Sequence, residues 1–237
     1  MKVALITGAN RGIGLETARE LGEMGIQVVL GSRDLERGRK AASLLSARGI
    51  AAEAVRLDVT LPADREQTRQ FLADRFGRLD ILVNNAAIMV KDSSSLERRE
   101  ELRRVFETNF FGIVELTQAL LPLMRKSRSG RIVNVSSILG SLTLHSDPNS
   151  RIYDSKLFSY NASKTALNAF TVHLAYELRG TRIKVNSADP GWVKTEMGGE
   201  HALVEVSEGG RSSARLATLP EDGPTGGFFR QDETFPW

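Results

Sequence analysis

Short apolar runs alternate with longer segments of helical periodicity along this chain, and that alternation constrains its fold more than any other feature. The apolar runs are rich in β-branched residues and bounded by Gly, Asp or Asn, as buried strands are. They cover Lys2–Thr7, Gln27–Gly31, Ala54–Leu57, Ile81–Val83, Arg131–Val135 and Lys184–Ser187. Apolar residues recur about every 3.6 positions over Ile13–Met24, Arg65–Phe76, Leu102–Met124 and Tyr160–Leu178. The alternation predicts an α/β fold with helices on both faces of a parallel sheet.

The length of the chain indicates one domain. Its 237 residues, 41% of them hydrophobic, are enough to bury one sizeable core. Two stretches interrupt the alternation: 138–159 carries the turn-rich sequence HSDPNS, and 195–218 is rich in Gly, Ser and Glu. Loops of this length in a compact domain are usually functional or disordered.

The charge balance argues against nucleic acid as a partner. The 32 Lys and Arg residues are interspersed with 29 Asp and Glu residues, which leaves a net charge of +3. The longest charged stretch, Leu96–Arg104, mixes both signs at three- and four-residue spacing. That pattern favours a solvated helix face over a phosphate-binding stripe.

Composition excludes several other classes of function. The chain has no cysteine, which excludes a disulfide scaffold and a cysteine nucleophile and fits a cytoplasmic location. No window approaches the roughly 20 apolar residues that cross a bilayer, and the first apolar run is too short for a secretion signal. None of His145, His173 and His201 has metal-ligand spacing, so we expect no required metal.

A glycine-rich turn follows the first predicted strand. Gly8, Gly12 and Gly14 lie in the sequence TGANRGIG, which opens a helix. The free N–H groups and the dipole of a helix N-terminus attract a pyrophosphate, and glycine lets the backbone come close to it. Such a turn can also merely pack a strand against a helix, but its position after the first strand favours dinucleotide binding.

The end of the second predicted strand bears on which dinucleotide is bound. Gly31 stands where an acid commonly holds the ribose hydroxyls of NAD, while Arg33 follows it and Arg11 lies within the glycine turn. A guanidinium suits the phosphate on the adenosine 2′-oxygen, so we predict NADP(H) in preference to NAD(H). In the alternative, Arg33 is a solvated surface residue and Asp34 takes the ribose.

Tyr160 and Lys164 lie four positions apart at the start of a helical pattern, and so on one helix face. A free tyrosine has a pKa of about 10, and a nearby cation favours its phenolate and lowers that value. Upstream, Ser136 and Ser137 end a predicted strand, where a parallel sheet presents catalytic groups. A hydroxyl there could polarise a substrate carbonyl.

In order and spacing, these motifs resemble those of the short-chain dehydrogenases/reductases, in particular carbonyl-reductase-like members, over nearly all of Lys2–Thr195. The resemblance implies a doubly wound Rossmann fold of about seven strands, with a cofactor-binding half at 1–130 and a catalytic and substrate-binding half at 131–237. It implies NADP(H)-dependent reduction of a small ketone or aldehyde, reversible as oxidation of a secondary alcohol. The alternative is an NADP(H)-binding sensor without turnover, a class that usually lacks part of the catalytic set.

The resemblance assigns four catalytic roles. Ser137 and Tyr160 would hold the carbonyl between them, and Tyr160 would give its proton to the developing alkoxide. Lys164 would lower the pKa of the tyrosine and bind the nicotinamide ribose. Asn109, an asparagine in a predicted helix interior where it is mildly unfavourable, would organise a water linked to the lysine.

The resemblance also assigns the cofactor contacts. Asp58 and Val59 would meet the adenine, the backbone at Val193 and the Thr195 hydroxyl would hold the carboxamide, and Ala87 replaces the glycine usual in an Asn-Asn-Ala-Gly motif. The full set is Gly8, Asn10, Arg11, Gly12, Ile13, Gly14, Ser32, Arg33, Asp58, Val59, Asn85, Ala86, Ala87, Tyr160, Lys164, Pro190, Gly191, Val193 and Thr195.

The spacing from Ser137 to Tyr160 is longer than is common in the family, so 138–159 carries an insertion. Two interpretations stay open: the insertion walls the substrate pocket, or it is a surface excursion. Candidate pocket residues are Leu139, Leu142, Leu144, Tyr153, Trp192, Met197, His201, Leu203 and Val206. The long helices 102–124 and 160–178 could pair across a two-fold axis, but the insertion could obstruct that pairing, so homo-oligomer and monomer both stay open.

Overall fold

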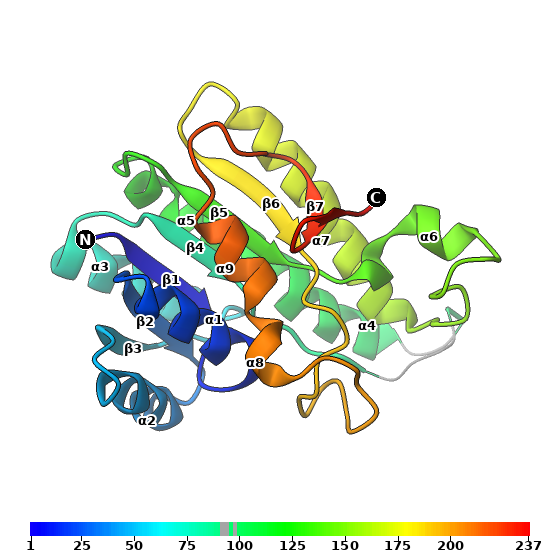
Figure 1. The fold of residues 1–237 in the computed structure, drawn as a ribbon, viewed down its shortest axis with the longest axis horizontal. Helices are drawn as coiled ribbons and strands as arrows, with labels where there is room; N and C mark the ends of the chain where they lie inside the picture. The colour runs from blue at the N-terminus through cyan, green and yellow to red at the C-terminus, as the bar shows by residue number, and fades with distance from the viewer. Residues whose placement is uncertain (91–94, 97–98) are drawn as a thin grey trace.

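The computed structural model of the chain describes residues 1–90, 95–96 and 99–237 (Figure 1). The charged stretch predicted at Leu96–Arg104 therefore lies partly outside the described residues. Within the described part, Arg104 pairs with Glu101 at 2.9 Å and Glu100 is exposed, as on a solvated helix face. No helix among the described residues combines the length and apolar character that a membrane span requires.

One eight-stranded sheet forms the centre of the molecule, in the order β3-β2-β1-β4-β5-β6-β7-β8 (Figure 1). The first seven strands are parallel and the last is antiparallel. The strands are β1 (Val3–Thr7), β2 (Gln27–Ser32), β3 (Ala52–Arg56), β4 (Ile81–Asn84), β5 (Arg131–Val135), β6 (Lys184–Ala188), β7 (Phe228–Arg230) and β8 (Glu233–Thr234). The predicted doubly wound parallel sheet is confirmed, and all six predicted strands form.

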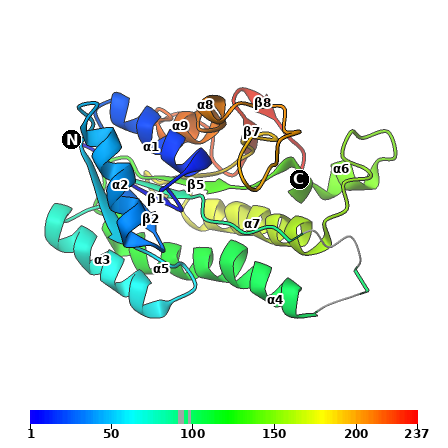
Figure 2. The same cartoon turned by 90° about the horizontal axis from the view of Figure 1, so that it is seen from below.

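Helices cover both faces of the sheet (Figure 2). One layer holds α1 (Gly12–Glu23), α2 (Leu35–Ser46), α8 (Val206–Gly209) and α9 (Arg211–Ala217). The other holds α3 (Pro62–Phe76), α4 (Arg99–Phe106), the π-helical turn η1 (Glu107–Phe111), α5 (Gly112–Met124) and α7 (Phe158–Glu177). Each layer buries its own apolar cluster against the sheet, with Leu21 and Leu45 in the first and Leu120 and Leu174 in the second. Burial of apolar surface on both faces is what the near-continuous hydrophobic strands require.

Several segments differ from the sequence prediction. Helix α2 was not predicted; Asp34 caps it by accepting a hydrogen bond from the Arg37 N–H at 3.1 Å. The predicted 102–124 helix is interrupted by η1. The two predicted loops contain short helices: η2 (Ile138–Gly140) and α6 (Leu142–Ser146) in the first, and α8 and α9 in the second. In each case tertiary packing orders a segment whose own apolar periodicity is short or broken.

A chain of hydrogen-bonded side chains crosses the sheet beneath α5 and α7. The Asn84 amide donates to Thr117 Oγ1 at 3.1 Å and to Asn134 Oδ1 at 2.9 Å, and the Asn134 amide donates to Thr171 Oγ1 at 2.8 Å. The hydroxyls of Thr171 and Ser187 lie 2.9 Å apart. All five side chains are buried. Because buried polar groups lose stability without partners, these bonds fix how α5 and α7 sit on β4, β5 and β6.

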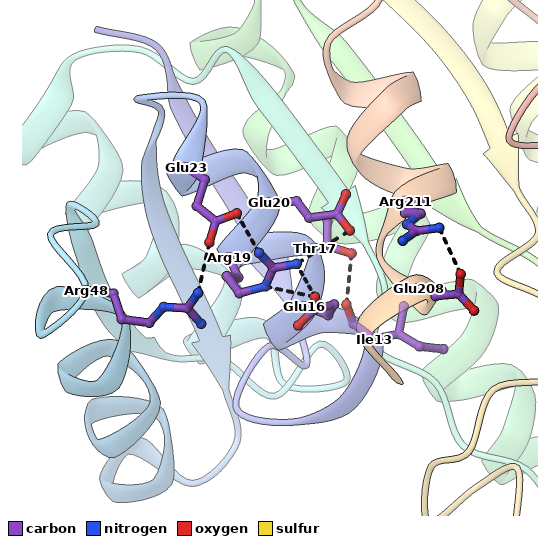
Figure 3. Close-up of polar contacts among 9 residues, drawn as sticks. All are labelled: Ile13, Glu16, Thr17, Arg19, Glu20, Glu23, Arg48, Glu208 and Arg211. Atoms are coloured by element: carbon purple, nitrogen blue, oxygen red, sulfur yellow. Dashed lines mark hydrogen bonds and ion pairs between the residues drawn. The ribbon is translucent and has the colours of Figure 1, made fainter. Parts of the chain in front are cut away.

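Charged side chains join α1 to its neighbours at the outside of the first layer (Figure 3). Arg19 donates to Glu16 and, at 2.5 Å, to Glu23, which also accepts from Arg48 beyond the end of α2 at 3.1 Å. Burial raises the pKa of Glu20 in the same group. Arg48 and Glu23 are exposed, and exposed pairs of this kind contribute little to stability.

The insertion leaves part of the outer face of α7 uncovered. Helix α6 projects beyond the N-terminal end of α7 (Figure 1), and Val172 and Tyr176 on α7 are exposed. Pairing of this helix across a two-fold axis stays a prediction.

Arg131 is a fully buried arginine at the end of the sheet opposite the glycine turn. Its guanidinium donates to the Leu219 carbonyl at 2.6 and 2.9 Å and to the Pro220 carbonyl at 2.9 Å, beyond the C-terminal end of α9. It also donates to the Gly130 carbonyl at 2.8 Å. One side chain thus satisfies several carbonyl groups and joins β5 to the segment after α9.

We expect Arg131→Ala to lower the free energy of unfolding by about 3 kcal/mol, because it leaves buried carbonyl groups without donors. Urea-unfolding midpoints of the variant and the wild type measure the effect. Arg75→Ala is the matched control: Arg75 is exposed, pairs with Glu53 at 3.3 Å and lies over the Phe76 ring, and its loss should change stability by less than about 0.5 kcal/mol. Equal losses in the two variants would contradict the buried role.

Candidate active site

The carboxyl ends of β1, β4, β5 and β6 bring most of the predicted site residues to one edge of the sheet. The strand order reverses between β1 and β4, because β2 and β3 lie on one side of β1 while β4 to β7 lie on the other. In an open α/β sheet, the ligand crevice lies outside the carboxyl ends of the strands at such a reversal. The glycine turn follows β1, Asn85 follows β4, and Ser137 follows β5.

The glycine turn packs too closely for larger residues. A Cβ atom at Gly14 would lie 2.6 Å from Asn85 Nδ2 and 2.7 Å from the Gly8 carbonyl oxygen. Gly12 has a φ of +57°, and a Cβ there would meet only Thr195 Cγ2, at 3.4 Å. The backbone therefore packs closely against the segment after β4 at Gly14, while Gly12 adopts a left-handed conformation beside Thr195.

The N-terminus of α1 is available to an anion. The helix begins at Gly12 with no side-chain cap and no acidic residue in its first turn. Asn10 and Ile13, both half-buried, flank this position. Uncapped N–H groups together with the helix dipole favour a phosphate group at this end.

Thr7 joins the ends of β1 and β4, although the sequence analysis did not select it. Its hydroxyl accepts from the backbone N–H of Asn85 at 2.9 Å and of Ala86 at 2.8 Å, and the Asn85 amide donates to the Thr7 carbonyl at 2.8 Å. These contacts place Ala86 and Ala87 at the crevice. Its hydroxyl at the last position of the first predicted strand was the sequence feature that could have identified Thr7.

Arg33 is the exposed cation at the end of β2. Asp34 beside it is engaged as the cap of α2 and pairs with Arg37 at 3.3 Å. The Ser32 hydroxyl donates to the Asp34 carbonyl at 2.7 Å. Arg33 makes no ion pair with any residue that the structure describes. These contacts favour Arg33 over Asp34 as the residue free to meet a ligand.

Arg11 in the glycine turn pairs with Glu196, which lies in the loop after β6. Thr195 beside it accepts from the Gly198 N–H at 3.1 Å, so its hydroxyl stabilises a local turn. Pro190, Gly191 and Val193 precede it on the same loop, and Val193 is buried. The structure thus places this loop against the glycine turn.

Asp58 closes a turn after β3. Its Oδ1 accepts from the Thr60 N–H at 3.0 Å and from the Thr60 hydroxyl at 2.7 Å, while its own N–H donates to Asp64 at 2.9 Å. Val59, which follows, is buried. The turn-capping role of Asp58 is therefore present, and contact with adenine stays a prediction.

Ser137, Tyr160 and Lys164 lie together at the end of β5. The Ser137 hydroxyl is a hydrogen-bond partner of the Tyr160 phenol. Lys164, only 1% exposed, donates from Nζ to the Val135 carbonyl at 2.6 Å and lies 5.6 Å from the centroid of the Tyr160 ring. The structure thus brings three of the four predicted catalytic residues into contact with one another or with adjacent backbone.

Burial governs the protonation of this group. It raises the pKa of Tyr160 to about 12, together with the nearby negative charge of Asp189 and against the Ser137 hydrogen bond. Burial also lowers the pKa of Lys164 to about 7. Lys164 is not among the causes of the raised pKa of Tyr160, and the lowering of the tyrosine pKa by Lys164 stays a prediction.

Asn109 is buried within η1 and is engaged by its neighbours. Its Oδ1 accepts from the Ile88 N–H at 2.8 Å, and its Nδ2 donates to the Ile88 carbonyl at 2.9 Å and to Ser163 Oγ at 3.0 Å. Ser163 belongs to α7, one position before Lys164. The side chain therefore ties η1 to α7 and to the segment after β4, and its predicted link to a water stays a prediction.

The insertion is partly core and partly surface. Leu139 and Leu144 pack against the cluster of Ile138, Ile152, Phe228 and Phe235, whereas Leu142 and Tyr153 are exposed. Trp237 stacks on Phe228 at 5.7 Å between ring centroids. Leu142 and Tyr153 thus fit a surface excursion, whereas Leu139 and Leu144 are packed inside the protein.

The remaining candidate pocket residues lie on the loop after β6. Trp192, Met197, His201 and Leu203 are exposed and Val206 is half-buried. Among the described residues, no three His, Asp or Glu side chains are grouped as metal ligands.

Asp189 is a buried residue of the site that was not among the predicted site residues. It lies at the end of β6, where Oδ1 accepts from the Ile138 N–H at 2.8 Å and Oδ2 accepts from Arg230 Nε at 2.5 Å. Its contact with Arg230 depends on β7, which no sequence pattern indicated.

The comparisons with known proteins agree with this geometry. Residues 2–203 match the family described as short chain dehydrogenase. The chain is 33% identical to carbonyl reductase (NADPH) 1 of Mus musculus, over 99% of this chain and 98% of that protein. It is 33% identical to (+)-neomenthol dehydrogenase of Arabidopsis thaliana, over 98% and 97%. The crystal structure of NADPH-bound carbonyl reductase from chicken fatty liver superposes with a TM-score of 0.87 at 30% identity and covers all of both chains.

The family match covers most of the chain, these relatives cover nearly all of it, and the fold agrees throughout. The chain therefore belongs to the short-chain dehydrogenase/reductase family.

Proposed function

We propose that this chain reduces a small ketone or aldehyde with NADPH and, in reverse, oxidises a secondary alcohol. The observation that carries the proposal is the group of half-buried Ser137 with buried Tyr160 and Lys164 at the end of β5, on the same sheet edge as the glycine turn. The names of the relatives support it, because one is an NADPH carbonyl reductase and another a menthol-type dehydrogenase. Together they indicate an oxidoreductase acting on C=O and CH–OH groups.

The residues present fit a dinucleotide. The uncapped N-terminus of α1 would hold the pyrophosphate, and the lack of a side chain at Gly12 would let the backbone approach it. Arg33, exposed and unpaired with the described residues, would hold the 2′-phosphate that distinguishes NADP(H). When bound, NADPH supplies the hydride.

Ser137 and Tyr160 orient and polarise the substrate. The Ser137 hydroxyl is a hydrogen-bond partner of the Tyr160 phenol, so a carbonyl oxygen bound beside them would accept from both. As negative charge develops on that oxygen, the Tyr160 phenol transfers its proton to it. The raised pKa of Tyr160 keeps the phenol protonated until then.

Lys164 and Asn109 support the tyrosine. The lowered pKa of Lys164, about 7, lets its amine exchange protons near neutral pH and so resupply the phenol. Lys164 would also hold the nicotinamide ribose. Asn109 positions α7 through Ser163, whose hydroxyl donates to the Tyr160 carbonyl at 2.7 Å.

The proposed substrate is a small molecule. Exposed Trp192, Met197 and Leu203 on the loop after β6 supply apolar surface close to the glycine turn, which suits an apolar carbonyl compound. The absence of cysteine from the sequence supports a reducing compartment, and we propose the cytoplasm.

We expect Tyr160→Phe to reduce kcat for NADPH-dependent carbonyl reduction by at least about 10³-fold, because the phenolic proton has no replacement. The affinity for NADPH should change by less than about twofold, since phenylalanine keeps the ring and its packing. Steady-state oxidation of NADPH with a panel of ketones and aldehydes, and fluorescence titration with NADPH, measure the two quantities.

Tyr153→Phe is the matched control for this test. Tyr153 also carries a phenol near the active-site end of the sheet, but it is exposed and stacks under Lys156 Nζ at 4.6 Å. Its substitution should leave kcat within about twofold of the wild type, as surface changes usually do. Retained turnover in Tyr160→Phe would refute the proposed mechanism.

Arg33→Ala should raise the KM for NADPH by about tenfold or more, the loss expected for one charge-assisted contact to a phosphate. The KM for NADH should change little, because NADH lacks the 2′-phosphate. Parallel kinetics with the two cofactors test this. Arg39→Ala, which removes an exposed arginine of the neighbouring helix α2, is the control. A similar rise in KM for both cofactors would mean that Arg33 does not read the phosphate.

A further inference from the structure

Buried Asp189 and half-buried Arg230 form an ion pair beside the proposed active site. Asp189 is 1% exposed and lies just after β6, and Arg230 is the last residue of β7. Arg230 reaches Asp189 Oδ2 through Nε at 2.5 Å and also through Nη2. A carboxylate buried to this extent needs such a partner, because an unpaired buried charge is strongly destabilising.

The other oxygen of Asp189 holds the backbone that presents Ser137. Oδ1 accepts from the N–H of Ile138, the residue that follows Ser137, at 2.8 Å. Ser137 Oγ in turn accepts from the Leu139 N–H at 3.2 Å, and this bond caps the start of η2. The position of the serine hydroxyl therefore depends on where Asp189 holds this backbone.

The far end of η2 rests on the helix that carries Tyr160 and Lys164. A Cβ atom at Gly140 would lie 2.9 Å from the Lys164 carbonyl carbon, and the Thr165 hydroxyl donates to the Gly140 carbonyl at 3.0 Å. The segment from Ser137 to Gly140 is thus fixed by Asp189 at its start and by α7 at its end.

Building on the proposed function, we propose that Asp189, held by Arg230, is a positioning residue for carbonyl reduction. It fixes the backbone that presents the Ser137 hydroxyl, and it places a buried negative charge near the Tyr160 phenol. The pair would thereby keep the phenol in its proton-donating form up to higher pH.

The charged groups around Tyr160 support the second part of this role. Asp189 faces it from the end of β6, Arg230 stands behind Asp189 on β7, and Lys164 lies one turn along α7. After burial, the charge of Asp189 is the next largest cause of the raised pKa of Tyr160. Arg230 offsets part of that charge. Removing Asp189 should therefore make Tyr160 lose its proton at lower pH, and removing Arg230 should have the opposite effect.

The test is the pH dependence of kcat/KM for reduction by the wild type and by Asp189→Asn and Arg230→Gln. Reduction falls at high pH as Tyr160 loses its proton. In Asp189→Asn, which keeps an oxygen acceptor for Ile138 but has no charge, that fall should move to lower pH by about one unit. In Arg230→Gln it should move to higher pH. In Asp189→Ala, which also removes the acceptor, kcat should drop by about tenfold or more with an unchanged KM for NADPH.

Asp80→Asn is the matched control for a purely structural effect. Asp80 is also a buried carboxylate, 5% exposed, that accepts from a backbone N–H, that of Val3, at 2.9 Å and pairs with Arg78 at 3.1 Å. It precedes β4 and therefore lies at the opposite end of the sheet. Its substitution should lower stability as Asp189→Asn does but leave the pH profile where it is in the wild type.

A folded, active Asp189→Asn variant with the wild-type pH profile would overturn the inference. The proposed function fails differently, through a wild type that oxidises no NADPH or a Tyr160→Phe variant that retains turnover. In that event the alkaline absorbance titration of Tyr160, taken as the difference between each protein and its Tyr160→Phe form, decides the inference without turnover. A lower midpoint in Asp189→Asn would support it, and an equal midpoint would overturn it.

Discussion

The close contact between the turn after β1 and the segment after β4 is the constraint on which the site depends. At Gly14 there is no room for a side chain, because the Asn85 amide and the Gly8 carbonyl already occupy that space. The Thr7 hydroxyl holds Asn85 and Ala86 by their backbone N–H groups. Any residue larger than glycine at this position would push the two strand ends apart and widen the crevice between them.

Helix α7 is fixed to three other parts of the fold. Thr171 bonds to Asn134 on β5 and to Ser187 on β6, Ser163 bonds to Asn109 in η1, and Gly140 in η2 packs against Lys164. Tyr160 and Lys164 can therefore be held in a nearly dry position with single directed partners, the Ser137 hydroxyl and the Val135 carbonyl. Burial raises the pKa of Tyr160 and lowers the pKa of Lys164, so each side chain favours its own neutral form. Neutral forms of both groups suit a site that must hold and release a proton rather than a fixed charge.

The sheet and the grouping of the proposed catalytic residues could be predicted from the sequence, because both follow from local signals. Apolar runs marked β1 to β6, and the motifs around Gly8, Ser137 and Tyr160 lie at strand ends that a parallel sheet must bring together. Helix α2 was missed because its segment is rich in charge, although Asp34 before it is a good cap. The pairing of β7 with β6 was also missed, because a three-residue strand has no periodicity to detect.

The contacts that set the protonation of Tyr160 and Lys164 could not be predicted from the sequence, for a further reason. Whether Lys164 meets the Tyr160 phenol or the Val135 carbonyl depends on a few ångströms of packing, not on the four-residue spacing that both arrangements share. Likewise, nothing near Asp189 in the sequence pointed to Arg230, which is 41 positions away. Long-range pairs of this kind arise only once the sheet order is known.

The π-helical turn at Glu107–Phe111 has a consequence for how this helix can change in length. A π turn accommodates one extra residue within an otherwise α-helical segment, and each residue of an α-helix advances the helix by about 100°. A single-residue deletion there would restore regular α-helix with an unbroken ladder of hydrogen bonds. The regular helix would nevertheless turn Asn109 away from Ile88 and Ser163 or rotate α4 about its own axis. Indels in this segment are thus tolerable to the backbone but not to the link with α7, so its length is constrained by side-chain geometry alone.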